Sequence, residues 1–361
     1  MKTERLQLLD ALKGYAILGV VLVHMLIFSK INVAMPYYLS TFIRSGMFAV
    51  QMFFMLSAFG LLLSDKPTSS IQNISFLLRR LIRLLPLYYA MLAVFVVVGF
   101  IYPVKPFSFL DLIAHVFLIH SLSPLWINSI HPAGWYVSDI LFMYLTVMIF
   151  AKEMVDLNKI LVLFFLSIIF YLGATICLTN SHIIHDKEIM NNFMYMWYPA
   201  QLPVFLLGGI AVAIYKTKTF QINKPSIVII FIIILLWLFI SLIGISIPMH
   251  LKYAVIYSIL TLFLIKYPIK LVVNKVVCFI GKRSYSIYLS HLLVIYGLRE
   301  VVFKTNYGLS TLKLWILFAL LSISISIAIS LPLFEIFERR IPEYLLKIVF
   351  PLNGKRAAHY S

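Results

Sequence analysis

Apolar segments of about 20 residues recur along nearly the whole chain, and a helix of that length crosses the roughly 30 Å hydrocarbon core of a membrane. The chain is 62% hydrophobic and only 12% charged, which excludes an ordinary soluble globular protein. We therefore predict an all-α, polytopic helical bundle with about ten transmembrane helices. The candidate spans are residues 10–29, 42–63, 82–101, 134–150, 160–178, 198–215, 226–246, 251–267, 284–303 and 312–336.

Basic residues outnumber acidic ones by 30 to 13, and they gather in the short loops between the apolar segments. Clusters placed in this way orient the spans with their basic ends in the cytoplasm and contact anionic lipid head groups, which argues against nucleic-acid binding. The pattern predicts that both termini are cytoplasmic. The largest predicted cytoplasmic clusters lie within residues 79–83, 266–283 and 339–356.

Residues 110–128 are apolar but carry Asp111, His115 and His120. An eleventh span here would invert every later loop and remove the charge asymmetry, so we predict an interfacial or re-entrant helix at the outer face. His131 is predicted to lie at the outer surface with the other two histidines. Their spacing matches no compact metal-binding motif, so no metal site is predicted.

One ionisable pair lies inside the first candidate span. Lys13 and His24 are eleven residues apart, which places them on the same face of a helix and roughly 16 Å apart along its axis. Ionisable side chains at membrane depth are costly and usually mark function. Two interpretations of His24 remain open, a packing histidine that bonds a neighbouring carbonyl and a general base that deprotonates a hydroxyl group.

Three arginines, Arg79, Arg80 and Arg83, stand at the cytoplasmic start of the third candidate span. Their spacing of three and four residues lets the guanidinium groups converge on one surface. They either anchor the topology against lipid head groups or form a pocket for an anionic donor, because guanidinium groups bind phosphates in a bidentate manner. A CoA thioester carries such phosphates.

Ser284, Tyr288 and His291 follow a spacing of four and then three residues, so they share one helix face. Polar residues on one face of a buried helix either bind substrate or hold neighbouring helices together.

Two further segments carry polar groups within candidate spans. Ser57 in the second span is either a close-packing residue or a nucleophile with an adjacent base. Trp135 and Asp139 begin the fourth span, where the carboxylate is expected to orient an imidazole or to pair with an arginine.

Five of these segments, in order, resemble motifs of the acyltransferase-3 family of membrane-bound acyltransferases. The matching segments are 9–16 with His24, 53–59, 80–86, 284–291 and 337–339. Three departures from the family pattern stand out. Lys13 replaces the usual arginine, Ala58 replaces glycine, and Ile341 separates Arg340 from Pro342.

The resemblance implies transfer of an acyl group, most often acetyl from acetyl-CoA, to a sugar hydroxyl of a surface glycan such as O-antigen or capsule. It implies a multi-pass protein of the bacterial inner membrane that contacts membrane lipids and a carbohydrate or lipid-linked acceptor. Acetyl-CoA is then a co-substrate, and no bound cofactor is predicted. The predicted domains are an acyltransferase-3 transmembrane domain at 1–345 and a basic cytoplasmic tail at 346–361.

The motifs and the family resemblance together define a predicted site. His24, Lys13 and Asp139 are the predicted catalytic residues, and Arg79, Arg80 and Arg83 the predicted donor-binding residues, while Ser57, Tyr288, His291 and Trp135 are predicted to bind substrate or to be structural. Two alternative functions remain open: a non-enzymatic exporter or flippase of glycan or lipid, and a transferase of succinyl or longer acyl groups.

Overall fold

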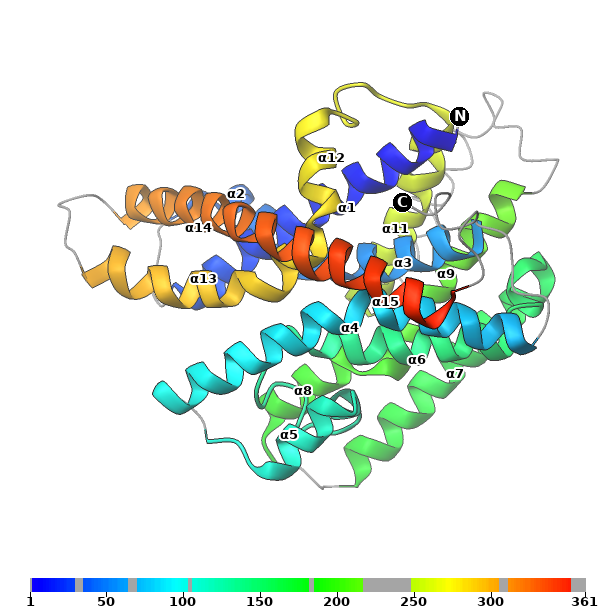
Figure 1. Ribbon diagram of the computed structural model, residues 1–361, viewed down its shortest axis with the longest axis horizontal. Coiled ribbons are helices and arrows are strands. Elements are labelled where there is room, and N and C mark those ends of the chain that lie inside the picture. The colour runs from blue at the N-terminus through cyan, green and yellow to red at the C-terminus, as the bar shows by residue number, and fades with distance from the viewer. Residues whose placement is uncertain are drawn as a thin grey trace.

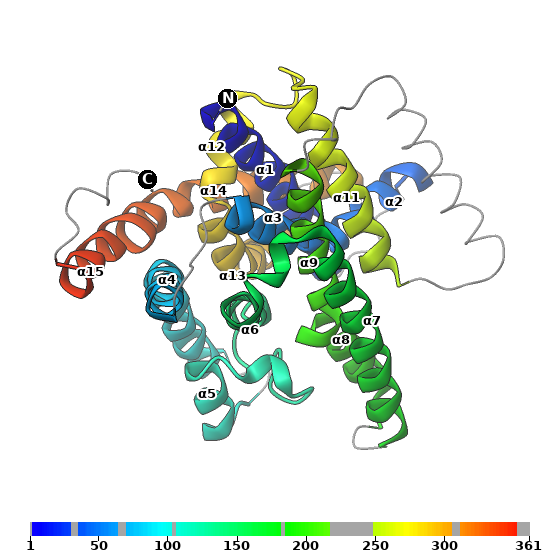
Figure 2. The same cartoon turned by 90° about the vertical axis from the view of Figure 1, so that its right-hand side faces the viewer.

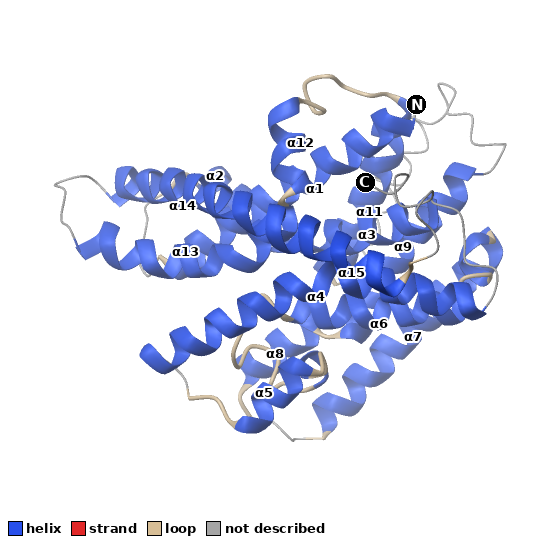
Figure 3. Cartoon of the chain, in the orientation of Figure 1, coloured by secondary structure: helices blue, strands red, loops and turns tan. Residues whose placement is uncertain are grey.

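A computed structural model describes residues 2–29, 35–63, 70–102, 106–181, 185–216, 248–304 and 311–351. Within these ranges the regular elements are all helical and no strand occurs (Figures 1 and 3). The α-helices are α1 (Lys2–Phe28), α2 (Tyr37–Ser45), α3 (Ala49–Leu63), α4 (Ser70–Ile101), α5 (Phe109–Val116), α6 (Trp135–Phe150), α7 (Leu157–Asn180), α8 (Lys187–Met196), α9 (Tyr198–Lys216), α11 (Met249–Lys266), α12 (Lys275–Lys282), α13 (Ser284–Lys304), α14 (Thr311–Leu333) and α15 (Ile341–Val349).

Eight helical segments of the described chain are long and apolar enough to cross a membrane, and α6 is a shorter apolar helix beside them. The predicted all-α, multi-pass membrane fold is therefore confirmed. The predicted span at 226–246 lies outside the described residues, as do residues 352–361 of the predicted basic tail.

The long helices run back and forth between two ends of the bundle (Figure 1). We call the end at which α1 begins the proximal end, and the opposite end the distal end. In Figure 1 the proximal end is on the right, and α15 also ends there, whereas α13 meets the start of α14 at the distal end on the left. Helices α1, α4 and α13 thus run from the proximal to the distal end, and α3, α6 and α9 run back.

Burial separates central helices from peripheral ones. The apolar stretches that contain α3 and α9 are about two-thirds or more buried, at 67% and 72%, whereas that of α7 is only 11% buried. Figure 2 shows α3, α9 and α13 near the middle of the bundle, with α4 and α7 on opposite sides. Because α7 exposes a row of large apolar side chains, it is suited to face lipid.

Glycines allow the central helices to approach closely. A Cβ atom at Gly208 of α9 would lie 2.9 Å from the carbonyl carbon of Met55 in α3, and closer still to its oxygen. A Cβ atom at Gly281 of α12 would similarly overlap the backbone of Asp10 in α1. Small residues at such crossings let helix backbones pack without a side chain between them.

The segment after α4, for which an interfacial or re-entrant helix is predicted at residues 110–128, contains no described helix long enough to cross a membrane. Helix α5 has only 8 residues and would extend about 12 Å. Its start is fixed by a capping box, in which the Asp111 backbone N–H donates to Ser108 Oγ and the Ser108 backbone N–H donates to the Asp111 carboxylate. Turns and a short 3-10 helix (His120–Leu122) then lead back to α6 at the distal end.

Candidate active site

Two histidines from opposite parts of the chain lie against each other in the bundle. His24 comes from α1 and His291 from α13, and His24 Nδ1 lies 2.7 Å from His291 Nε2. Their rings stack with centroids 5.0 Å apart and 14° between the planes. His291 is fully buried, and His24 is half-buried. The helix packing therefore joins two imidazoles that are 267 residues apart.

The hydrogen bonds of this pair define which ring nitrogens carry protons. His291 Nδ1 lies 2.6 Å from the carbonyl oxygen of Tyr288, and because a carbonyl only accepts, Nδ1 is the protonated nitrogen of a neutral His291. His291 Nε2 then carries a lone pair and accepts a hydrogen bond from His24 Nδ1–H. It follows that His24 Nε2 holds a free lone pair, which is the state of a general base.

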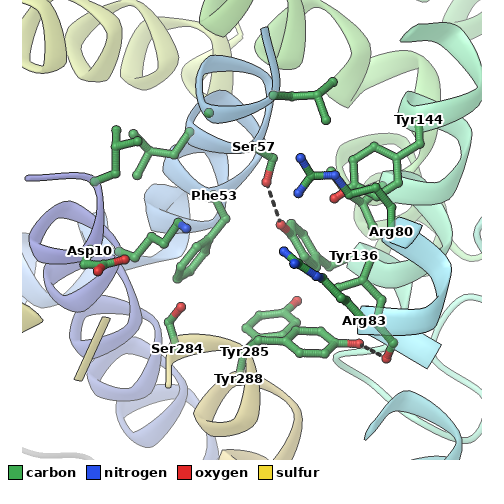
Figure 4. A pocket seen from close by; sticks show the side chains of 17 residues that line it. Asp10, Phe53, Ser57, Arg80, Arg83, Tyr136, Tyr144, Ser284, Tyr285 and Tyr288 are labelled. Atoms are coloured by element: carbon green, nitrogen blue, oxygen red, sulfur yellow. Dashed lines mark hydrogen bonds between the residues drawn. The ribbon is translucent and has the colours of Figure 1, made fainter. Parts of the chain in front are cut away.

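A cavity of about 380 Å³ lies between α1, α3, α4, α6 and α13 (Figure 4). Tyr288 connects this cavity to the histidine pair, since its side chain lines the cavity and its carbonyl accepts the hydrogen bond of His291. The described residues that line the cavity are Leu9, Asp10, Lys13, Phe53, Leu56, Ser57, Gly60, Leu61, Arg80, Arg83, Leu84, Tyr136, Ile140, Tyr144, Ser284, Tyr285 and Tyr288.

The cavity carries an excess of positive charge. Lys13, Arg80 and Arg83 contribute three cations, and Asp10 is the one acidic residue among the described lining residues. Figure 4 shows the two arginines reaching in from α4 and Asp10 lying across the cavity on α1. A site with this charge suits an anionic ligand, and the two guanidinium groups suit phosphate.

A half-buried carboxylate lies near Lys13, outside the cavity lining. Glu338 lies in a π-helix (Phe334–Arg340) between α14 and α15, and the hydroxyl of Ser286 donates a hydrogen bond to it. The charge of Glu338 is close enough to those of Lys13 and Arg283 to attract both. π-helical turns occur frequently at functional sites, and here the turn carries the carboxylate to the cationic region.

In comparison with known protein families, residues 6–335 of the 361-residue chain match the acyltransferase domain family Acyl_transf_3. The chain belongs to the acyltransferase-3 family. It is a multi-pass membrane acyltransferase. No curated protein and no solved structure matches it.

The fold brings the acyltransferase-3 motifs together at one place. Lys13, Arg80, Arg83, Ser57 and Tyr288, all named from the sequence, line the cavity. The hydroxyl of Ser57 lies 3.3 Å from that of a tyrosine on α6. Among the described residues no imidazole bonds to Ser57, so the serine has no adjacent base to activate it as a nucleophile.

Three predicted site residues of this acyltransferase-3 chain belong neither to the described cavity lining nor to the histidine pair. Arg79 is exposed and its guanidinium lies 5.1 Å from the centre of the Phe350 ring. The predicted convergence of all three arginines is wrong for Arg79, because the cavity-lining face of α4 lies about 90° away from it around the helix. Trp135 is buried with its ring against that of Phe54, a packing contact.

Asp139 is fully buried in α6, but in the described part of the chain it bonds to neither an imidazole nor an arginine. The expected pairing is therefore wrong. Ser121, in the short 3-10 helix, is one of the polar side chains near it. Helix α6 lines the cavity with Tyr136, Ile140 and Tyr144, and Asp139 is not among the described lining residues.

His115, His120 and His131, for which the sequence predicts a place at the outer surface, are all fully buried within the protein. The rings of His115 and His120 stack with centroids 4.1 Å apart, and His131 stacks on Phe95 at 4.2 Å. Burial lowers the pKa of His120 to about 3 and the pKa of His131 well below its usual value. These imidazoles are therefore neutral at physiological pH. Among the described residues no group of His, Cys, Asp and Glu is arranged to hold a metal ion.

The sequence analysis missed the tyrosines of the cavity. Tyr136 and Tyr144 of α6 and Tyr285 of α13 all line it. Tyr136, Ile140 and Tyr144 recur every four residues, so a helical-face analysis of that span would have grouped them. That spacing does not show which neighbouring helix the face meets.

Proposed function

We propose that this protein transfers an acetyl group from acetyl-CoA to a hydroxyl of a cell-surface glycan, such as O-antigen or capsule, in the bacterial inner membrane. The observation that carries the proposal is the hydrogen-bond chain from the Tyr288 carbonyl through His291 to His24. This chain leaves a lone pair on His24 Nε2, as transfer to a hydroxyl requires.

The cationic cavity supports acetyl-CoA as the donor. The phosphates of CoA carry negative charge, and Lys13, Arg80 and Arg83 supply the matching cations at the proximal end. The basic clusters of the sequence favour a cytoplasmic position for that end, where acetyl-CoA is available. The histidine pair lies further toward the distal end, where a glycan hydroxyl can approach from outside.

The proposed reaction uses the two sites together. His24 Nε2 accepts the proton of the glycan hydroxyl, and the oxygen of that hydroxyl attacks the thioester carbonyl carbon. A carbon–oxygen bond forms and the carbon–sulfur bond breaks, so that CoA leaves as a thiolate. The imidazolium of His24 then returns its proton to the thiolate sulfur, which restores the neutral pair. His291 stabilises the transient positive charge, because its Nε2 lone pair faces His24 Nδ1–H.

The test uses membranes from a strain that carries its own glycan acceptors, with the gene deleted and replaced by either wild type or His24→Ala. Membranes are incubated with deuterium-labelled acetyl-CoA, and the label in the purified glycan is measured by mass spectrometry and NMR. We expect label with wild type and none above the deletion background with His24→Ala, at equal protein amount in the membrane. Full labelling by the alanine variant would contradict the role of His24, and a lack of label with wild type would contradict the proposed function.

A further inference from the structure

Three aromatic rings meet at one end of the cavity. Phe53 of α3, Tyr136 of α6 and Tyr288 of α13 each contact the other two, with centroids 6.3, 6.3 and 5.4 Å apart. Figure 4 shows these rings with the cations of the cavity. Phe53 and Tyr288 are only 8% and 4% exposed, so both rings are held by surrounding side chains.

The order of lining residues along each helix places these rings at the distal end. Helix α3 runs toward the proximal end, and Phe53 is the first of its described lining residues. Helix α6 also runs toward the proximal end, and Tyr136 is the first of its described lining residues. Helix α13 runs toward the distal end, and Tyr288 is the last of its described lining residues. The three rings therefore close the cavity on the side away from its proximal end.

The histidine pair lies just beyond this closure. His291 follows Tyr288 by three residues, about one helical turn further toward the distal end, and the two rings are 5.8 Å apart. Neither His24 nor His291 is among the described residues that line the cavity. The three rings therefore lie between the cations of the cavity and the histidine pair, on the direct path of an acyl group whose CoA the cations hold.

We propose that Phe53, Tyr136 and Tyr288 form an acyl filter that admits acetyl and excludes longer or charged acyl groups, an inference that rests on the proposed function. A longer chain would need to push aside buried rings, which costs free energy in a packed interior. A succinyl group would also bring a carboxylate among apolar rings, where a charge loses its hydration. The hydrogen bond between Ser57 and Tyr136, at 3.3 Å, helps to hold the α6 ring in place.

The experiment offers acetyl-CoA and butanoyl-CoA together, each with a distinct deuterium label, to membranes that contain the protein and their own glycan. The measured quantity is the ratio of butanoyl to acetyl groups on the glycan, which does not depend on how much protein accumulates. Wild type is expected to transfer acetyl almost exclusively. Phe53→Ala opens the filter and is expected to raise the ratio at least about tenfold, since each methylene in a fitted pocket discriminates by roughly 10- to 200-fold.

Phe53→Leu keeps more of the side-chain volume and is expected to raise the butanoyl-to-acetyl ratio by a smaller factor. This variant replaces Phe53→Ala in the test if the alanine variant folds poorly. Phe59→Ala is the matched control, because Phe59 lies on the same helix and is also buried but faces Tyr215 at 6.5 Å rather than the cavity. Its ratio is expected to equal that of wild type.

An unchanged ratio in both Phe53 variants would overturn the filter, as would a wild type that transfers both groups equally well. In those cases acetyl transfer by wild type would leave the proposed function standing. A wild type that places neither label on the glycan would contradict the proposed function itself.

Discussion

Replacement of His291 by alanine tests the hydrogen-bond chain directly. The substitution removes the acceptor that lies 2.7 Å from His24 Nδ1, and with it the contact that keeps the proton on that nitrogen. His24 Nε2 then no longer holds its lone pair in a defined orientation. A positioned general base contributes about 10²- to 10⁴-fold, and loss of the partner that sets the tautomer of the serine-protease histidine costs about 10⁴-fold. We expect acetyl transfer to fall by about 10²- to 10⁴-fold.

A series of variants distinguishes this role from simple packing. His291→Gln keeps an oxygen acceptor and is expected to recover part of the lost rate. The double variant with His24→Ala is expected to be no slower than His24→Ala alone, because both residues act as one unit. His250→Ala is the control, since this histidine of α11 is also buried but packs on Tyr171 and Tyr195.

The assay measures the rate of deuterated acetyl incorporation into glycan per amount of protein in the membrane. His250→Ala is expected to retain the wild-type rate per protein. The reasoning is refuted if His291→Ala acetylates at the wild-type rate. It is also refuted if the effects of the two histidine substitutions multiply independently, because separate residues would then each contribute their own stabilisation of the transition state.

Three further predictions concern the donor site, packing and pH. Arg80→Gln is expected to raise the KM for acetyl-CoA about tenfold or more in initial-rate measurements, whereas exposed Arg79→Gln leaves it unchanged. Gly208→Ala is expected to destabilise the detergent-solubilised protein by about 1–3 kcal/mol in thermal melting. Gly173→Ala is expected to leave the stability unchanged, because a Cβ atom at Gly173 would meet open space. Because folded His120 has a pKa of about 3 and the unfolded side chain one of about 6.5, stability falls as pH drops between those values. The loss from this one group is about 2 kcal/mol at pH 5, and melting curves of His120→Gln should show a weaker pH dependence.

The sequence by itself determined the membrane fold and the chemical types of the site residues. Apolar segments of membrane-spanning length leave a helical bundle as the spanning structure, because every backbone group in lipid must be bonded within the protein. The cost of an ionisable group at that depth singled out His24, and the spacing along α13 placed Ser284, Tyr288 and His291 on one face. These inferences need only the length, composition and periodicity of single helices.

Only the tertiary structure decided which faces meet. The contact between His24 and His291 depends on how α1 packs against α13, and helical periodicity carries no information about a partner 267 residues away. The same limit explains the misplaced expectations for Arg79 and for Asp139, neither of which is among the described residues that line the cationic cavity. Helix rotation within a bundle is set by side-chain packing between helices, so the base, the cations and the rings between them emerge only when those helices are assembled.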